Sequence, residues 1–236
     1  MSTAADPRVP PLTSKINRKV YPMTTAPAPA IAAPRALARP KAFFDRARPL
    51  FARGIISPAQ LAGTQCKLDA FGAAGCPITY VAYGLATSFW ETAQTMQPVR
   101  EIGRGKGRAY GVPGKHGGQI AYGRGDVQLT WDYNYAKADA ELGLKGALIG
   151  NYDLALDPAI SARIMVEGML EGWFTGKRLS TYLPSSGFAT LAQFTQARRI
   201  INGVDRAAQI AALAAVFQDA LADGGWGPIP APAPRA

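Results

Sequence analysis

The sequence predicts a mainly α-helical protein with a small glycine-rich β lobe inserted after its second helix. Two segments before residue 92 combine helix-start signals with apolar residues three and four positions apart, the spacing of one helix face. Glycine then dominates from Gly103 to Gly125 and the helical period disappears. Helical signals resume near residue 157 and continue almost to the end. These three observations define two helical regions around a loop-rich insertion.

The first two helices begin at clear local signals. Ser57, Pro58 and Gln60 form the pattern of a capping box with proline at the first helical position, which predicts a helix over about 58–71. Pro77 starts the next, PITYVAYGLATSFWET. One face of this second helix is apolar and carries Ile78, Val81, Leu85 and Phe89.

The insertion reads GRGKGRAYGVPGKHGGQIAYGRG and predicts loops and short strands, with Gln119–Tyr122 and Val127–Trp131 as the expected strands. After it, Asp157 is expected to cap a helix that starts at Pro158. Asp205 is expected to cap the last helix. One face of that helix carries Ile210, Leu213, Ala214, Phe217 and Leu221.

The chain of 236 residues suits one domain with two tails. Residues 1–41 contain eight prolines and carry a net charge of +6, so we expect a disordered basic arm. Residues 42–223 form the predicted domain, with a net charge of only +3, and residues 224–236 form a Pro/Ala-rich tail with +1. The arm is either a plain tether or an electrostatic contact with an anionic envelope. The low charge of the domain argues against specific nucleic-acid binding.

Several other classes of protein are disfavoured by composition. The sequence lacks the run of about 20 apolar residues that a membrane-spanning helix needs. Its first 30 residues have no apolar core of a signal peptide. Two cysteines, Cys66 and Cys76, do not make a disulfide framework, and a single histidine, His116, is expected in an exposed loop. We therefore predict no metal and no cofactor.

Glu91 is the first candidate catalytic residue. It falls near the C-terminal end of the second helix, where the partial negative charge of the helix disfavours a carboxylate, and Phe89 and Trp90 could desolvate it. A general acid needs such a setting. The simpler interpretation is a solvated glutamate at a helix end. Glu101 follows ten residues later, beyond the turn implied by Pro98, and would complete the pair of carboxyls that glycosidases use.

The segment Ala121–Tyr135, AYGRGDVQLTWDYNY, is the candidate sugar-binding region. Aromatic faces, amides and hydroxyls suit sugar rings, which present apolar faces and many hydroxyl groups. A hairpin whose aromatic residues fill a small core is the alternative. The candidate contacts here are Tyr122, Gln128, Thr130, Trp131 and Asn134.

Four blocks in order resemble family 19 of the glycoside hydrolases, the chitinase-like group that includes many phage endolysins. They are SFWETAQTMQPVREIGRG, AYGRGDVQLTWDYNYAKADAELGL, LALDPAISARIMVEGMLEGWFTGKRL and ARRIINGVDRAAQI. The resemblance covers roughly 41–222. It implies a lysozyme-like, mostly helical, two-lobed fold with a cleft between the lobes.

The resemblance also implies roles for individual residues. Glu91 matches the general acid, and Glu101 matches the acidic position that would supply the second carboxylate, for which Asp126 and Asp132 are alternatives. The cleft-lining positions of the family match Tyr122, Gln128, Asn134 and, in the Ile-Asn-Gly motif, Asn202. One departure is clear: Trp90 stands where the family usually has histidine.

The expected activity is acid–base hydrolysis of β-1,4 bonds in peptidoglycan, in the manner of an endolysin. Chitin is the alternative substrate, and an inactive binding or virion structural module is the alternative class. Such a protein is expected to be a monomer. Without a signal peptide it would accumulate in the cytoplasm of the host bacterium and reach the wall after holin-type release.

Overall fold

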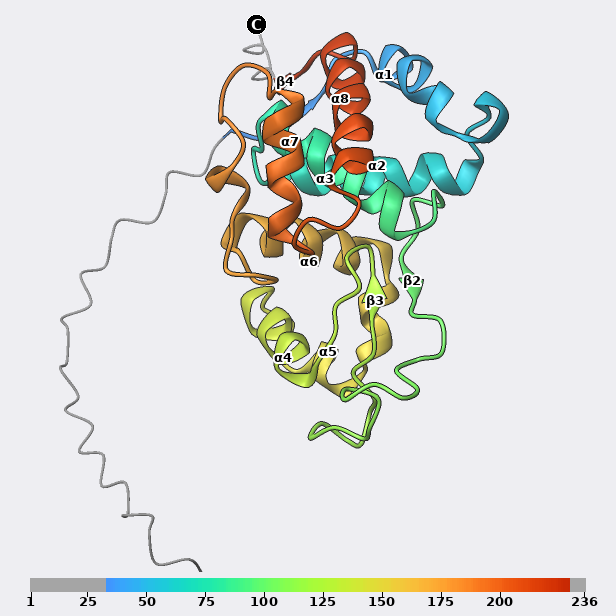
Figure 1. The fold of residues 1–236 in the computed structure, drawn as a ribbon, viewed down its shortest axis with the longest axis vertical. Helices are drawn as coiled ribbons and strands as arrows, with labels where there is room; N and C mark the ends of the chain where they lie inside the picture. The colour runs from blue at the N-terminus through green and yellow to red at the C-terminus, as the bar shows by residue number, and fades with distance from the viewer. Residues whose placement is uncertain (1–32, 230–236) are drawn as a thin grey trace, which may run out of the picture. The chain divides into compact units, whose positions relative to one another are not determined.

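The computed structural model describes residues 33–229, which form two lobes (Figure 1). The helical lobe, at the top of the view, consists of α1 (Pro40–Ala47), α2 (Pro58–Ala73), α3 (Ile78–Glu91), α7 (Leu191–Ala197) and α8 (Ala207–Asp223). The loop lobe, at the lower end, comprises residues 99–156 and holds β2 (Val99–Arg100), β3 (Arg124–Gly125), α4 (Asp132–Glu141), α5 (Ala147–Gly150) and the short 3₁₀ helix η3 (Tyr152–Leu156). The helix α6 (Pro158–Glu171) packs against both α2 and η3. The predicted mainly α-helical class is confirmed.

Short 3₁₀ turns connect the longer helices. In chain order they are η1 (Arg48–Leu50), η2 (Ala52–Gly54), η4 (Leu179–Thr181) and η5 (Arg198–Ile200). None of the helices among residues 33–229 is long and apolar enough to cross a membrane.

Local signals determine where the main helices begin. The Ser57 hydroxyl accepts a hydrogen bond from the Gln60 N–H at 3.2 Å, and the Gln60 side chain accepts one from the Ser57 N–H at 2.8 Å, which is the predicted capping box. The carboxylate of Asp157 accepts hydrogen bonds from the first two free N–H groups of α6. Both predicted starts are confirmed, and α3 begins directly after Pro77.

The start of α8 differs from the prediction. Asp205 does not cap it; Arg206 occupies the N-cap position with φ of 56°. The backbone carbonyl of Asp205 is instead held by the Arg198 side chain at 2.9 Å. The expected apolar face is correct, because Ile210, Ala214, Phe217 and Leu221 are buried and Leu213 is half-buried against the core. This face packs on α3, where the rings of Phe89 and Phe217 meet edge to face with 6.0 Å between centroids.

The predicted strands over Gln119–Tyr122 and Val127–Trp131 are wrong. The loop lobe holds only the two-residue antiparallel pair β2–β3 and a single bridge between Arg124 and Leu129. Positive φ angles at Gly125, Gln128 and Trp131 turn the chain back on itself, so an extended run cannot form there. The lobe therefore consists mainly of loops and short helices, with β2 and β3 as its only two-residue strands among the described residues.

The domain boundaries at residues 41 and 224 also need correction. Within the expected arm, β1 (Arg35–Leu37) pairs antiparallel with β4 (Trp226–Pro228), and α1 starts at Pro40. The Arg39 guanidinium donates to the Asp223 carbonyl, which ties the two ends together. Proline is tolerated at the edge of a sheet, so the prolines near β1 and β4 do not prevent these two strands from pairing. Proline content therefore does not predict disorder at this position. Residues 1–32 and 230–236 lie outside the described part, and the rest of the predicted arm and tail with them.

A buried ion pair joins the two lobes. Lys67 of α2 and Asp126 of the loop lobe are both fully buried, with 2.8 Å between Nζ and Oδ1. Hydroxyls from two further helices complete the shell of the carboxylate, Ser88 of α3 at 2.9 Å and Ser161 of α6 at 2.7 Å. The Lys67 ammonium also donates to the Met96 carbonyl at 3.0 Å. Every helix that flanks the joint thus contributes a polar group to it.

Candidate active site

Glu91 is the last residue of α3, and a buried arginine holds it. The distance between its Oε1 and Nη2 of Arg198 is 2.8 Å. Its side chain is 22% exposed and that of Arg198 only 2%. Its Oε2 has no hydrogen-bond partner among residues 33–229. The carboxyl group is therefore fixed through one oxygen and open through the other.

The surroundings of Glu91 differ from the expected aromatic pocket. Phe89 points into the core, where its ring meets those of Phe51 and Phe217. Trp90 is 38% exposed. A guanidinium, not an apolar wall, is the neighbour that the structure gives to Glu91.

Arg198 is a site residue that the sequence did not single out. It lies in the ARRIING block after α7, and its Nε donates to the Asp205 carbonyl at 2.9 Å. Thr87 and Tyr83, one and two turns before Glu91 on α3, lie on the same side. Burial raises the pKa of Tyr83 to about 12, although Thr87 and Arg198 beside it act in the opposite direction. The sequence could not distinguish Arg198 from Arg199 and Arg206, which lie in the same motif. Only the fold shows that Arg198 contacts Glu91.

Glu101 directly follows β2, and both of its oxygens have neutral donors. Oε1 accepts from the Tyr110 hydroxyl at 2.8 Å, and Oε2 accepts from the Gly123 N–H at 3.0 Å. Its own N–H donates to the Gly123 carbonyl at 2.8 Å. Burial and the hydrogen bond to Glu101 raise the pKa of Tyr110. Glu101 thus connects the end of β2 to Tyr110 and to the residue before β3. Its role as the second carboxylate stays a prediction.

The two alternative carboxylates have other contacts. Asp126 is fully buried in the ion pair with Lys67, so it cannot touch a polymer. Asp132 accepts from the Tyr152 hydroxyl at 2.7 Å and from the Lys115 N–H at 2.8 Å. Burial raises the pKa of Asp132, but these two donors and the nearby charges of His116 and Lys115 together leave the pKa below its usual range.

Three of the six predicted sugar-binding side chains form hydrogen bonds to the backbone of the loop lobe. The Gln128 amide donates to the carbonyls of Val99 and Gly125, both at 3.1 Å. The hydroxyl of Thr130 donates to the Gln128 carbonyl at 2.7 Å, and the Asn134 amide to the Thr130 carbonyl at 2.8 Å. These contacts form one chain of side-chain to backbone bonds. Substrate contacts by the same residues stay predictions.

The remaining three candidates differ in access. Tyr122 is 7% exposed, and the Arg124 guanidinium covers its ring at 3.5 Å from the centroid. Trp131 is 39% exposed and available to a ligand. Asn202 is exposed, and its N–H donates to the Arg198 carbonyl at 3.0 Å. Asn202 thus belongs to the Glu91 side of the molecule, while Trp131 belongs to the loop lobe.

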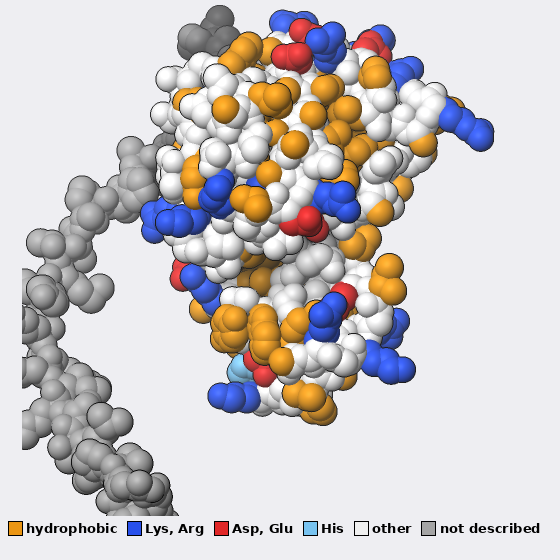
Figure 2. Space-filling view, in the orientation of Figure 1, with side chains coloured by type: hydrophobic (Ala, Val, Ile, Leu, Met, Phe, Trp, Pro, Cys, Tyr) orange, Lys and Arg blue, Asp and Glu red, His pale blue; other side chains and the backbone are white. Residues whose placement is uncertain are grey.

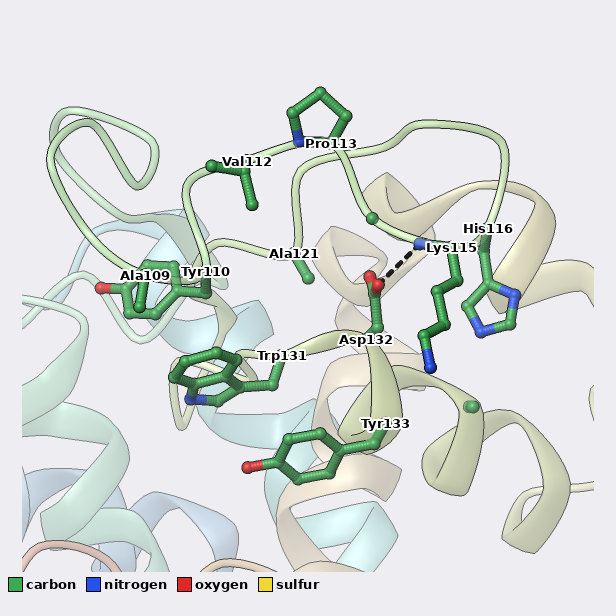
Figure 3. A pocket seen from close by; sticks show the side chains of 12 residues that line it. Ala109, Tyr110, Val112, Pro113, Lys115, His116, Ala121, Trp131, Asp132 and Tyr133 are labelled. Atoms are coloured by element: carbon green, nitrogen blue, oxygen red, sulfur yellow. Dashed lines mark hydrogen bonds between the residues drawn. The ribbon is translucent and has the colours of Figure 1, made fainter. Parts of the chain in front are cut away.

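The loop lobe contains a hollow of about 670 Å³ with an aromatic wall (Figure 3). The Trp131 ring lies edge-on to Tyr110, with 5.4 Å between centroids, and stacks beside Tyr133 at 6.2 Å. Lys115 and His116 line the other end together with Asp132. The expectation of a freely exposed His116 is corrected, because this side chain is half-buried in the wall.

Metal ligands do not gather in the part of the chain that the structure describes. No group of three or more His, Cys, Asp or Glu side chains among residues 33–229 is placed to hold an ion. Cys66 and Cys76 are free thiols, and burial raises the pKa of Cys76 to about 12.

Comparison with known proteins finds structural neighbours only. No family model and no curated protein matches the chain. Chitinase C from Streptomyces griseus HUT6037 is similar in structure, with 23% identity, a TM-score of 0.46 and coverage of 80% of this chain and 78% of that one. A bacterial family 19 chitinase has 22% identity, a TM-score of 0.47 and coverage of 79% and 95%. A mutant of chitinase C has 24% identity, a TM-score of 0.47 and coverage of 80% and 78%.

Proposed function

We propose that this chain is a glycoside hydrolase that cleaves β-1,4 bonds of an acetylated amino-sugar polymer, with Glu91 as the proton donor. One observation carries the proposal. A buried guanidinium fixes one oxygen of Glu91 while the other oxygen has no partner among the described residues. This geometry holds the carboxyl in place and leaves one oxygen available to a ligand.

Arg198 has a defined part in the proposed reaction. Protonated Glu91 gives its proton to the glycosidic oxygen, and negative charge develops on the carboxyl as the bond breaks. The guanidinium at 2.8 Å stabilises that charge without having to move. Arg198 thereby favours proton transfer and holds the donor in one orientation.

Glu101 is the proposed base, which activates the water that attacks the anomeric carbon from the opposite face. This inverting route needs carboxyls about 6.5–9.5 Å apart, against about 5–5.5 Å for a retaining route. The hydrogen bonds from Tyr110 and Gly123 keep Glu101 in place. At least one of these hydrogen bonds must weaken or break when the carboxylate accepts a proton from water.

Peptidoglycan is the proposed substrate, cleaved in the manner of an endolysin that acts as a monomer. The resemblance of its motif blocks to a family that includes many phage lysins supports this. We propose that the protein accumulates in the host cytoplasm and reaches the wall after holin-type release. Chitin is equally compatible with the Glu91 site. Trp90 in place of histidine keeps an inactive binding module as a third possibility.

Reducing-end release from purified peptidoglycan, with colloidal chitin in parallel, tests the proposal. We expect Glu91→Gln to lower the rate roughly 10²–10⁴-fold, the usual contribution of a general acid, with an unchanged circular dichroism spectrum. Activity on chitin alone would make the protein a chitinase. A folded protein without activity on either polymer would contradict the hydrolase proposal.

A further inference from the structure

The loop of residues 103–118 concentrates the positive charge of the domain. It carries four basic residues and no acidic one, whereas residues 42–223 as a whole have a net charge of +3. The rest of this range therefore sums to −1. The basic residues are Arg104, Lys106, Arg108 and Lys115.

These four cations are exposed and form no ion pair with any residue between 33 and 229. Other surface arginines are paired, such as Arg46 with Asp219 at 3.2 Å and Arg178 with Glu171 at 3.2 Å. Four like charges on a loop of sixteen residues repel one another, which costs stability unless a ligand neutralises them.

The same loop builds one wall of the aromatic hollow. Tyr110, Lys115 and His116 come from it, and Trp131 and Tyr133 face them from the start of α4 (Figure 3). Hydrophobic and basic side chains gather side by side over this end of the molecule (Figure 2). Exposed rings beside cations suit a ligand that has apolar sugar faces and negative groups together.

Two carboxylates adjoin the loop and reduce its excess charge without cancelling it. Asp132 holds the Lys115 N–H, and Glu101 holds the Tyr110 hydroxyl. Neither contacts a basic side chain of the loop in the described structure. The four ammonium and guanidinium groups therefore stay available to an anion.

We propose that this loop recognises carboxylate groups of an amino-sugar polymer whose rings lie in the aromatic hollow. Peptidoglycan carries such groups on its peptide substituents, whereas chitin is neutral. The inference rests on the proposed function and names the feature that separates the two candidate substrates. Because the contacts are exposed, they act mainly at low ionic strength.

The test measures binding of the full chain in a Glu91→Gln background, so that the polymer is not consumed. Co-sedimentation uses purified peptidoglycan and the same material with its carboxyls converted to amides, each at low and high salt. One variant removes three of the four positive charges of the loop, and a matched control removes the same charge from exposed sites elsewhere. The loop variant combines R104Q, K106Q and K115Q; the control combines R53Q, K145Q and K177Q.

We expect the loop variant to bind peptidoglycan roughly tenfold more weakly at low salt, with a much smaller difference at high salt. Binding to the amidated polymer should not change, and the control should stay within about twofold of the parent, as for scattered surface charges. Equal weakening on both polymers, or by both variants, would overturn the inference. Hydrolysis is measured separately, so an inactive protein that still shows this pattern would refute the proposed function and leave the inference standing.

Discussion

The two lobes use their carboxylates differently. In the helical lobe, α3 satisfies its own backbone N–H groups, and Glu91 at its end is left with a free oxygen. In the loop lobe, backbone N–H groups lack helical partners and take carboxylates instead. Glu101 accepts from Gly123, Asp132 from Lys115, and Asp139 from Gly146 and Leu148. A carboxylate is free for chemistry where regular structure has already satisfied the backbone.

The joint between the lobes gives the largest expected effect. Lys67→Met leaves the Asp126 carboxylate buried without its counter-charge, so we expect the free energy of unfolding to fall by about 3–5 kcal/mol. Urea denaturation at pH 7 measures it. The double variant Lys67→Met/Asp126→Asn removes the stranded charge and should recover part of the loss. A fall of less than about 1 kcal/mol would contradict the role of the pair as the main polar link.

Glu101→Gln asks whether a carboxylate tied to the loop lobe still takes part in chemistry. As the proposed base it should lower kcat roughly 10²-fold or more. Glu101 now accepts hydrogen bonds from two donors, the Tyr110 hydroxyl and the Gly123 N–H. The amide of glutamine would turn its NH₂ group toward one of them, so stability should fall as well. Loss of stability with full activity would remove Glu101 from the mechanism and leave it a purely structural residue.

Arg198→Gln tests the free carboxyl of the helical lobe. A hydrogen bond to a charged group contributes about 1.5–3 kcal/mol, so kcat should fall roughly 10- to 100-fold. Arg199→Gln is the matched control, because the Arg199 side chain contacts Gln196 and not Glu91. Arg198→Lys keeps the charge and should restore part of kcat. Equal activity of the two glutamine variants would show that the ion pair does not support catalysis.

Asp132→Asn gives the smallest expected change, and its size depends on pH. The pKa of Asp132 is lowered in the folded protein, so its ionised form stabilises the fold above the ordinary value of 3.8. That contribution disappears as the pH falls through the lowered value. We expect the variant to be about 1 kcal/mol less stable at pH 7 and to approach the parent near pH 2. Asp205→Asn, at an exposed site, serves as the control, and a gap that does not change with pH would refute the prediction.

The sequence predicted those features that depend on neighbours along the chain. Three such features depend only on residues a few positions apart, and all three are present. They are the capping box at Ser57 and Gln60, the aspartate cap at Asp157 and the apolar face of α8. Predictions failed where the partner is distant. Strand β1 depends on β4, almost two hundred residues away, and the strands expected from Gln119 onward give way to turns at Gln128 and Trp131.

The sequence by itself determined the helical class and the main helix starts, because local spacing and capping chemistry fix these. It also made Glu91 the leading candidate, through its place at a helix end and the family resemblance of its motif. The tertiary structure alone decided that Arg198 meets Glu91, that Asp126 is buried against Lys67, and that Glu101 braces the loop lobe. An ion pair between residues more than a hundred positions apart leaves no pattern in a single sequence. Packing decides which of many charged residues meet, and burial decides which of those contacts are strong.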